Sequence, residues 1–168
     1  MANHAEPRPS SEAVSETVSE AAPETVDLGI VDALAQLSFR VQGVLGQVAA
    51  EHGLSIIQLR LLGVLRDRRP GMQELAWYLG LDKSSMTGLV DRAERRGLVR
   101  RAPSPHDGRA VQVSLTTEGQ ELARTITAVA GHRIHALTED LGDAQRAQLS
   151  LLASMLVTDQ RSIGPLLP

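Results

Sequence analysis

The sequence of 168 residues contains no cysteine and no uninterrupted apolar segment long enough to cross a membrane. The absence of cysteine excludes disulfide bonds, thiolate-bound zinc and cysteine-based redox switches. A membrane-spanning helix needs about 20 apolar residues, and the N-terminus shows no basic segment followed by an apolar run. We therefore expect a soluble, cytoplasmic protein that does not bind to membranes.

The motifs of common catalytic sites are also missing. A serine, a histidine and an aspartate occur close together only at Ser104, His106 and Asp107, within one turn. Residues that are neighbours on a turn rarely form a catalytic triad, and no glycine-rich phosphate loop or oxyanion motif accompanies them. The sequence therefore predicts no enzyme activity, no catalytic residues and no cofactor.

His132 and His135 are the strongest metal-ligand candidates. Their spacing of three residues on an expected helix, with Glu139 nearby, is compatible with a shared metal ion. The chain has five histidines, so such a pair arises easily, and without cysteine the other ligands would have to come from distant segments. We expect no metal site, and a metal-responsive regulator stays open as an alternative function.

The formal net charge of -3 conceals a basic middle segment between acidic flanks. Residues 60–110 contain eleven Lys and Arg residues and six Asp and Glu residues, which gives this segment a charge of +5. The rest of the chain contains six basic and fourteen acidic residues and carries -8. A polyanion is the natural partner for the middle segment, and a solvated basic face without a partner is the alternative.

Composition and hydrophobic spacing divide the chain into four regions. Residues 1–26 are rich in Ser, Glu, Ala and Pro, which predicts a disordered acidic tail. Residues 27–54 predict a helix with one apolar stripe, because apolar side chains recur at spacings of four and three: Ile30, Leu34, Leu37, Val41, Val44 and Val48. Residues 117–168 predict a long helix to about Asp140 and a last helix from Gly142-Asp143. That last helix is apolar around nearly its whole circumference and needs another surface to cover it.

The fourth region, residues 55–116, begins with a helix-turn-helix pattern. Ser55 can cap a first helix, which Pro70-Gly71 terminates, and residues 72–79 predict a short helix closed by Gly80. Asp82 is a candidate cap for a helix over residues 83–96, and so short a turn between two helices is typical of a helix-turn-helix. The core positions are expected at Met72, Leu75, Ala76, Leu79, Met86, Leu89, Val90 and Ala93.

A β-hairpin is expected after these helices. Residues 98–101 and 110–115 favour strands, with Val111, Val113 and Leu115 on one side of the second strand. The intervening Pro103, Pro105 and Asp107-Gly108 are expected to prevent regular pairing and to reverse the chain. Arg100 and Arg101 would then lie at the base of the hairpin and Arg109 at its tip.

The outward face of residues 83–96 combines small hydroxyl side chains with a cation at each end. Short side chains let a helix approach a major groove closely, and hydroxyl and basic groups bond base edges or phosphates. The N–H groups at the helix start favour phosphate, and an arginine at the hairpin tip favours the minor groove. The candidate DNA-binding residues are Lys83, Ser84, Ser85, Thr87, Arg92, Arg100, Arg101 and Arg109.

The segment LDKSSMTGLVDRAERRGLVRRAPSPHDGRAVQVSLTTEG resembles the winged helix-turn-helix of the MarR family of transcriptional regulators. This family typically shows a recognition helix, a GLV-type exit and a D-x-R wing, followed by a strand and L-T-x-x-G. The similarity extends over residues 27–159. It implies a mainly α fold with a small β-hairpin wing, plus N- and C-terminal helices that form a dimerisation region. It also implies that Asp107 holds the wing arginine in place.

The function that the resemblance implies is a sequence-specific repressor that binds a pseudo-palindromic operator in double-stranded DNA as a homodimer. A small-molecule effector between the dimer helices and the DNA-binding lobe is implied by the family alone, with no ligand-binding residue assigned. The alternative from another class is a winged helix that serves as a protein-interaction or assembly module. Trp77 and Tyr78 depart from the family's pattern, and Trp77 is expected opposite the core side, either partly exposed or covered by a neighbouring segment.

Overall fold

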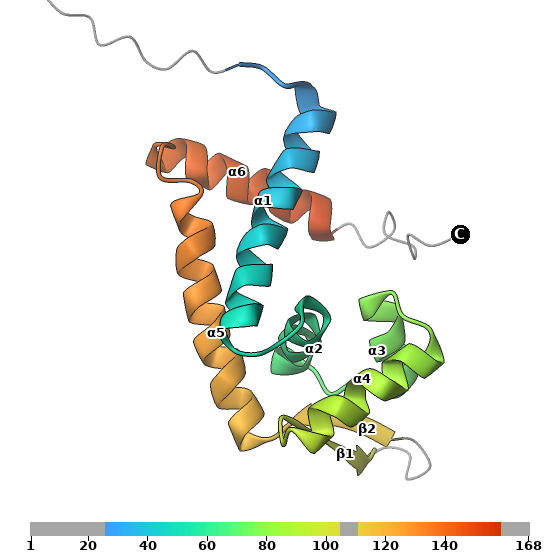
Figure 1. The fold of residues 1–168 in the computed structure, drawn as a ribbon. Helices are drawn as coiled ribbons and strands as arrows, with labels where there is room; N and C mark the ends of the chain where they lie inside the picture. Colours follow the sequence, from blue (N-terminus) through green and yellow to red (C-terminus); the bar gives the residue numbers. More distant parts are fainter. Residues whose placement is uncertain (1–25, 105–110, 159–168) are drawn as a thin grey trace, which may run out of the picture.

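Six helices and one two-stranded antiparallel sheet make up the described part of the chain, residues 26–104 and 111–158 (Figure 1). Their positions come from a computed structural model. The observed order confirms the expected mainly α fold with a small hairpin, whereas the predicted acidic tail lies outside the described residues except for Val26. In chain order the elements are α1 (Gly29–Glu51), α2 (Ile56–Asp67), α3 (Met72–Leu79), α4 (Lys83–Arg95), β1 (Val99–Pro103), β2 (Val111–Leu115), α5 (Thr117–Ala136) and α6 (Asp143–Thr158).

The boundaries of α2, α3 and α4 are set by the local hydrogen bonds and turns that the sequence predicts. Ser55 forms a capping box: its hydroxyl oxygen accepts from the backbone N–H of Gln58 at 3.4 Å, and the Gln58 side chain accepts from the Ser55 N–H at 2.9 Å. Gly80 ends α3 in the left-handed conformation with φ of 63°. Asp82 then caps α4. The turn between α3 and α4 therefore has the predicted helix-turn-helix form.

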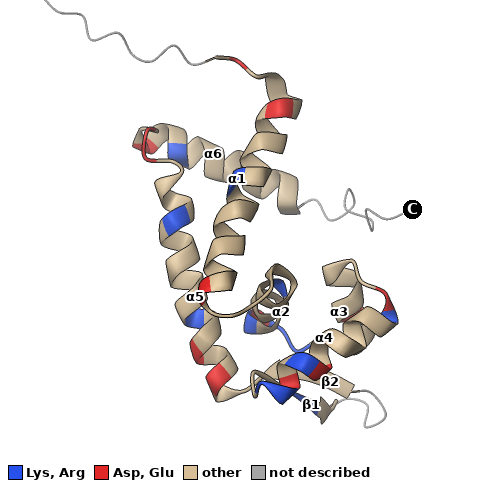
Figure 2. Cartoon of the chain, viewed as in Figure 1, with Lys and Arg blue, Asp and Glu red and all other residues tan. Residues whose placement is uncertain are grey.

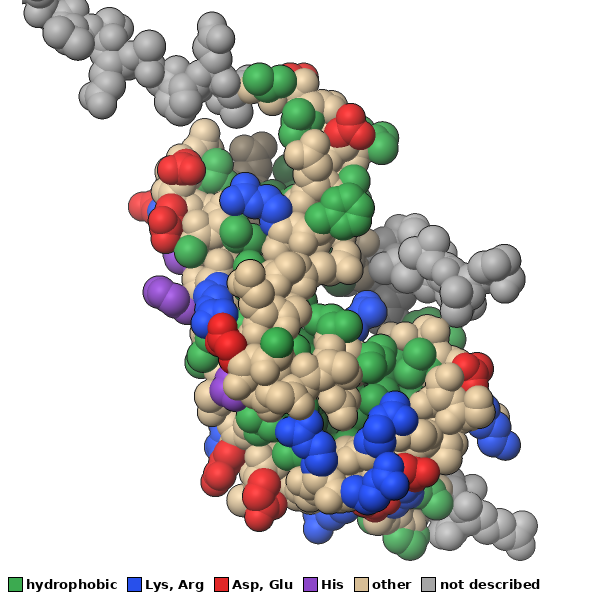
Figure 3. Space-filling model, in the orientation of Figure 1, with side chains coloured by type: hydrophobic (Ala, Val, Ile, Leu, Met, Phe, Trp, Pro, Cys, Tyr) green, Lys and Arg blue, Asp and Glu red, His purple; other side chains and the backbone are tan. Residues whose placement is uncertain are grey.

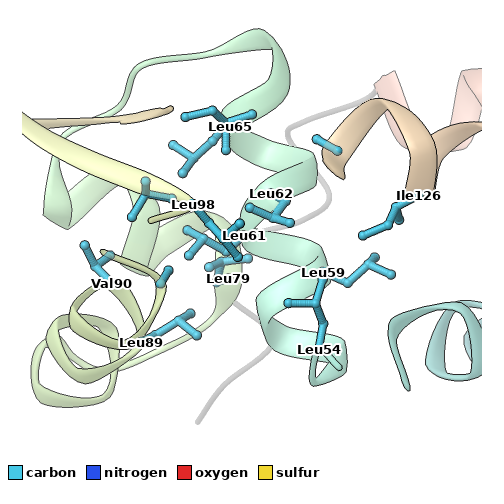
Figure 4. Packing of buried hydrophobic residues seen from close by; sticks show 14 of the residues in the cluster. Leu54, Leu59, Leu61, Leu62, Leu65, Leu79, Leu89, Val90, Leu98 and Ile126 are labelled. Carbon is cyan, nitrogen blue, oxygen red and sulfur yellow. The ribbon is translucent and has the colours of Figure 1, made fainter. Parts of the chain in front are cut away.

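The hydrophobic core lies where α2, α3 and α4 meet the hairpin and the adjoining ends of α1 and α5 (Figure 4). All four predicted core positions of α4 are buried, as are Leu75 and Leu79 of α3, whereas Met72 and Ala76 are half-buried. Burial of a side chain the size of Leu or Val contributes about 1.5–3 kcal/mol, so this cluster fixes the position of α4. The largest fully buried side chains are Leu61, Leu62, Leu75, Met86, Leu89, Val48, Val90, Val99 and Val113.

The hairpin extends further than predicted. β1 pairs with β2 from Val99 opposite Leu115 to Pro103 opposite Val111, so the expectation that Pro103 would prevent pairing is wrong. Proline is tolerated there because it is the last residue of its strand. Val111 at the same end of the sheet is 44% exposed, whereas Val113 and Leu115 are buried. The predicted apolar side of β2 is therefore covered only at the end nearer the core.

The loop between α2 and α3 adds an unpredicted backbone contact to the free edge of β2. The Val113 N–H donates to the Pro70 carbonyl at 3.0 Å, and Gly71 forms an isolated bridge with Gln112. The hairpin is thereby attached to the helix-turn-helix on both sides, because β1 follows α4 directly in the chain.

The start of α5 packs directly on the residue that precedes β1. A Cβ atom on Gly119 would lie 1.9 Å from the carbonyl oxygen of Leu98, so only glycine fits this contact. Thr116 caps α5 by accepting from the Gly119 N–H at 3.0 Å, and its hydroxyl donates to the Gly97 carbonyl at 2.6 Å. The threonine and glycine of the L-T-x-x-G motif therefore join the hairpin and the helix-turn-helix to the long helix α5.

The apolar stripe of α1 is covered at one end only. Val48 is fully buried, while Ile30 is 73% exposed and Leu34 is 47% exposed. The covered end packs beside α5 (Figure 1). There the Arg133 guanidinium donates to both carboxylate oxygens of Glu51 at 2.8 Å. The other end of α1 has no apolar cover among the described residues.

The two C-terminal helices differ in how they pack. α5 ends at Ala136, and residues 137–140, which the sequence assigns to the helix, form a turn instead. α6 begins at Asp143 as predicted and makes no extensive contact with the other described elements. Within the described ranges, no single helix is long and apolar enough to span a membrane, and α1 and α2 satisfy the criterion only when taken together as a pair bent by 93°.

Candidate nucleic-acid interface

α4 begins at a carboxylate that accepts four hydrogen bonds. Asp82 Oδ1 accepts from the backbone N–H groups of Ser84 at 2.8 Å and Ser85 at 2.9 Å. The Ser84 hydroxyl donates to Oδ1 at 2.5 Å, and the Ser85 hydroxyl donates to Oδ2 at 2.6 Å. The two serine hydroxyls, together with the backbone N–H groups, lower the pKa of Asp82 well below its ordinary value. The carboxylate is therefore ionised at neutral pH.

The exposed face of α4 is polar and flat at its centre. Ser84, Gly88, Asp91 and Arg95 follow one another at spacings of four, three and four residues, so they share the side of the helix opposite the buried core positions. Gly88 leaves the middle of this face without a side chain, and a Cβ atom there would lie 3.3 Å from the Arg92 guanidinium. A flat surface can therefore approach α4 closely at this point if the Arg92 side chain moves aside.

A hollow of about 340 Å³ opens beside this face, between the start of α2 and α4. Ser84, Ser85 and Arg92 contribute its polar side, and apolar side chains of α2, of the turn before α4 and of α4 itself contribute most of the rest. The full lining is Ile57, Leu81, Ser84, Ser85, Gly88, Leu89 and Arg92.

The Arg101 guanidinium is directed from β1 to two acidic residues of α4. Its Nη2 lies 2.6 Å from Asp91 Oδ1, and its Nη1 forms a second ion pair with Glu94. The Arg101 backbone N–H also donates to the Glu94 carboxylate at 3.2 Å. Both carboxylates raise the pKa of Arg101 above its ordinary value despite partial burial. Arg101 therefore offsets part of the negative charge of Asp91 and Glu94 and connects the hairpin to α4.

Basic side chains gather around α4 and the hairpin at the lower end of the molecule (Figure 2 and Figure 3). Lys83, Arg92 and Arg95 are exposed, and their side chains have no hydrogen-bond or ion-pair partner within the described residues. Arg100 is exposed on β1 and donates to the Ser114 hydroxyl at 3.3 Å across the hairpin. Arg96 instead donates to the carbonyl of Gly53 at 2.7 Å. Three cations of α4 are thus available for an external anion.

The predicted DNA-binding residues fall into three groups. Those of α4 lie exposed on the helix, and Arg100 is exposed on the hairpin, whereas Arg101 is already occupied by two carboxylates. Arg109 and Asp107 lie outside the described residues, and contacts with DNA stay predictions for every member of the set. The sequence reasoning missed Arg95, although its distance of eleven residues from Ser84 corresponds to about three helical turns and places both on one face.

Trp77 lies on the surface of α3, and its side chain is 51% exposed, which confirms the expected partial exposure. Its ring meets Tyr78 edge to face with ring centroids 5.1 Å apart. Tyr78 lies under the Arg68 guanidinium at 4.7 Å, and its hydroxyl donates to Glu74 at 3.3 Å. These contacts order the aromatic pair outside the core.

No group of three His, Asp or Glu side chains is placed to hold a metal ion in residues 26–104 and 111–158. His132 and His135 are exposed on α5. The sequence places Ser104, His106 and Asp107 close together, and only Ser104 belongs to the described residues.

Comparison with known proteins identifies the arrangement of α2, α3, α4 and the hairpin. A sequence profile described as MarR family matches residues 52–110. The chain is 33% identical over 118 residues to the HTH-type transcriptional repressor NicR of Pseudomonas putida, an alignment that covers 69% of this chain and 75% of NicR. The similarity to NicR therefore extends beyond the DNA-binding lobe.

Solved structures share most of the fold. A mutant of MarR from E. coli complexed with operator DNA has a TM-score of 0.60 and 25% identity, covering 74% of this chain and 91% of that chain. NadR in complex with 4-hydroxyphenylacetate has a TM-score of 0.65 and 25% identity, covering 83% and 99% of the two chains. Together with the identity to NicR, these matches show that the chain belongs to the MarR family of transcriptional regulators.

Proposed function

We propose that this transcriptional regulator binds its operator by placing α4 in the major groove of double-stranded DNA. The observation that carries the proposal is the exposed face of α4, which has no side chain at Gly88 and carries Arg92 and Arg95, two cations without an ion-pair partner among the described residues. A helix with short side chains can approach base edges, and arginine bonds guanine acceptors and phosphates. The structure of a MarR mutant with operator DNA supports this mode, and the name of NicR supports repression.

The hairpin is proposed to lie along the flank of the same duplex. Arg100 is exposed on β1 and is assigned to a phosphate. Arg109, which the D-x-R wing motif assigns to the minor groove, and Asp107, which would position it, complete the proposed contact outside the described residues. Replacement of Arg109 by Ala is expected to weaken operator binding without changing helix content.

The exposed apolar surface of α1 and α6 supports a homodimer. Ile30 and Phe39 of α1 are 73% and 71% exposed, and Leu152 of α6 is 51% exposed. A second copy presents the same apolar surface, so pairing about a twofold axis covers both. Two copies of α4 related by this axis would recognise a pseudo-palindromic operator whose half-sites lie about one helical turn, roughly 10 bp, apart.

A small-molecule effector forms the regulatory part of the proposal. Support comes from NadR, which was solved in complex with 4-hydroxyphenylacetate. The resemblance places such a molecule between the dimer helices and the DNA-binding lobe, with no residues assigned. The hollow beside α4 is a second location, because a molecule there would contact Ser84, Ser85 and Arg92 and so compete with DNA.

The proposal is tested by selecting duplexes that bind the full-length protein from a random library and measuring the affinity of arginine variants for the selected sequence. Arg92→Gln and Arg95→Gln are each expected to weaken binding by about tenfold, the size of one lost base or phosphate contact. Arg124→Gln on α5 is the matched control, because it removes the same charge from an exposed site outside α4 and the hairpin.

Equal affinities of the three variants would contradict the placement of α4 in the groove. Failure to select any duplex, with binding to another protein instead, would favour the interaction-module alternative. A change of stability on addition or chelation of zinc would favour the metal-responsive alternative.

A further inference from the structure

We infer that Ser84 and Ser85 read DNA as hydrogen-bond acceptors only, so that each operator half-site presents an adenine or a cytosine amino group to this pair. The inference rests on the proposed placement of α4 in the major groove and adds the chemical class of base that the helix selects. It follows from the direction of the hydrogen bonds at the start of α4.

A serine hydroxyl carries one proton, and both serines already donate theirs. Ser84 donates to Asp82 Oδ1 at 2.5 Å and Ser85 donates to Asp82 Oδ2 at 2.6 Å, so each oxygen of one carboxylate holds one hydroxyl. Each exposed hydroxyl oxygen therefore has only its lone pairs left for an external partner, and it can only accept a hydrogen bond. A partner that approaches this pair must therefore bring its own hydrogen.

The direction of these bonds is stable because Asp82 is ionised. A hydrogen bond to a charged acceptor is roughly twice as strong as one between neutral groups, so a serine would lose the stronger bond if it turned its proton toward a base. The same carboxylate also receives the backbone N–H groups of both serines, which fixes its position. The low pKa of Asp82 excludes the protonated form at physiological pH.

The negative charge of Asp82 also argues against a phosphate at this position. Phosphate carries no hydrogen to donate and would lie beside a carboxylate of the same sign. In the major groove, donors are the N6 amino group of adenine and the N4 amino group of cytosine, whereas guanine and thymine present O6, N7 or O4 acceptors. The serine oxygens can therefore accept a hydrogen bond from an amino group. Against guanine or thymine they would meet another acceptor oxygen or nitrogen, which is unfavourable.

The cleanest variant is Asp82→Asn. Asparagine is as good a helix cap as aspartate, and it offers one acceptor oxygen in place of two. At least one serine then has no side-chain oxygen at position 82 to accept its proton and can donate to a base. Circular dichroism of the variant checks that α4 is retained.

The experiment is a binding-site selection from a random duplex library with four full-length proteins: the wild type, Asp82→Asn, Ser84→Ala and Ser85→Ala. The alanine variants identify the base positions that the serines read, because preference there becomes weaker. At these positions the wild type is expected to prefer one orientation of a base pair over the reverse by roughly tenfold, because reversing the pair moves the adenine or cytosine amino group to the other strand. Asp82→Asn is expected to reduce that discrimination to within about twofold.

The inference is overturned if Asp82→Asn keeps the wild-type preference at the base pairs that the serines read. It is also overturned if the alanine variants change no base preference while Arg95→Gln still weakens binding, because the serines then act only as part of the helix cap. Loss of any effect from Arg92→Gln and Arg95→Gln as well would instead refute the proposed function itself.

Discussion

The Arg101 guanidinium on β1 lies 2.6 Å from the Asp91 carboxylate on α4, and this ion pair joins the two elements of the proposed DNA-binding surface. Glu94 completes the contact from the next turn of the same helix. This contact links the angle of the hairpin to the orientation of α4. It also distinguishes Arg101 from the other basic residues around it, because its guanidinium is already bound to carboxylates.

Arg101→Gln is expected to weaken operator binding through the position of the hairpin. A cation that binds phosphate directly contributes about 0.9 to the slope of log affinity against log salt concentration. Arg95→Gln should therefore lower this slope by about one, whereas Arg101→Gln should leave it nearly unchanged. Titrations at four salt concentrations measure both slopes. A loss of about one in the Arg101 variant would show that Arg101 binds phosphate, as the sequence suggested.

Gly88→Ala is expected to stabilise the protein and weaken operator binding at the same time. Alanine is favoured over glycine inside a helix by about 1 kcal/mol. The added Cβ would lie 3.3 Å from the Arg92 guanidinium, which must move, and it would add a side chain at the centre of the face that is proposed to meet DNA. Urea unfolding and fluorescence anisotropy with an operator duplex measure the two effects.

Gly63→Ala on α2 is the control for Gly88→Ala, since a Cβ there has no neighbour within 4 Å. It should give a similar gain in the free energy of unfolding with unchanged DNA affinity. If both glycine variants bind DNA equally well, the centre of the α4 face does not approach the duplex.

Gly119→Ala is expected to destabilise the fold by about 3 kcal/mol or more, because the new Cβ meets backbone atoms of Leu98 that cannot move without displacing β1. Thermal unfolding of the variant beside Gly131→Ala, a glycine of the same helix with open space around it, isolates the contact. A Gly119 variant as stable as the Gly131 variant would show that α5 does not pack on Leu98.

Asp82 gives the stability of the protein a dependence on acid. Its folded pKa lies below the ordinary value of 3.8, so its contribution is complete above about pH 4 and decreases as the pH falls toward the folded pKa. The wild type should therefore lose free energy of unfolding when the pH is lowered from about 6 to about 3. Asp82→Asn should lose less over the same range, because it has no carboxylate at this position. An equal pH dependence of the two proteins would mean that Asp82 does not bind the Ser84 and Ser85 groups in solution.

Leu152→Asp is expected to produce a monomer that binds the operator poorly. The Leu152 side chain is 51% exposed on α6, where a partner copy would cover it, and a charge there would be buried in the dimer. Sedimentation equilibrium measures the mass. Ile56→Asp is the control, because Ile56 is 40% exposed at the start of α2, outside α1 and α6. A variant at Leu152 that stays dimeric would exclude this part of α6 from the interface.

The sequence predicted those parts of the fold that local interactions decide. Ser55, Gly80 and Asp82 each act within a few residues of their own position, as caps or as a left-handed turn. The apolar spacing of residues 83–96 likewise identified the four buried positions of α4, because a single periodicity determines one face of a helix.

The parts that were missed depend on contacts between distant segments. Arg101 pairs with Asp91 and Glu94, ten and seven residues away across a turn in the chain, so its sequence neighbours gave no sign of this contact. The bond from Val113 to Pro70 joins segments that no periodicity relates. The direction of the serine hydroxyls also required the position of the Asp82 carboxylate.

The salt dependence of operator affinity tests the central claim most directly, because the claim concerns phosphates and cations. For the wild-type protein and a selected operator duplex, log affinity should fall linearly with log salt concentration, with a loss of roughly a thousandfold or more between about 50 and 200 mM. An affinity that stays nearly constant over this range would contradict the binding of α4 and the hairpin to the DNA backbone.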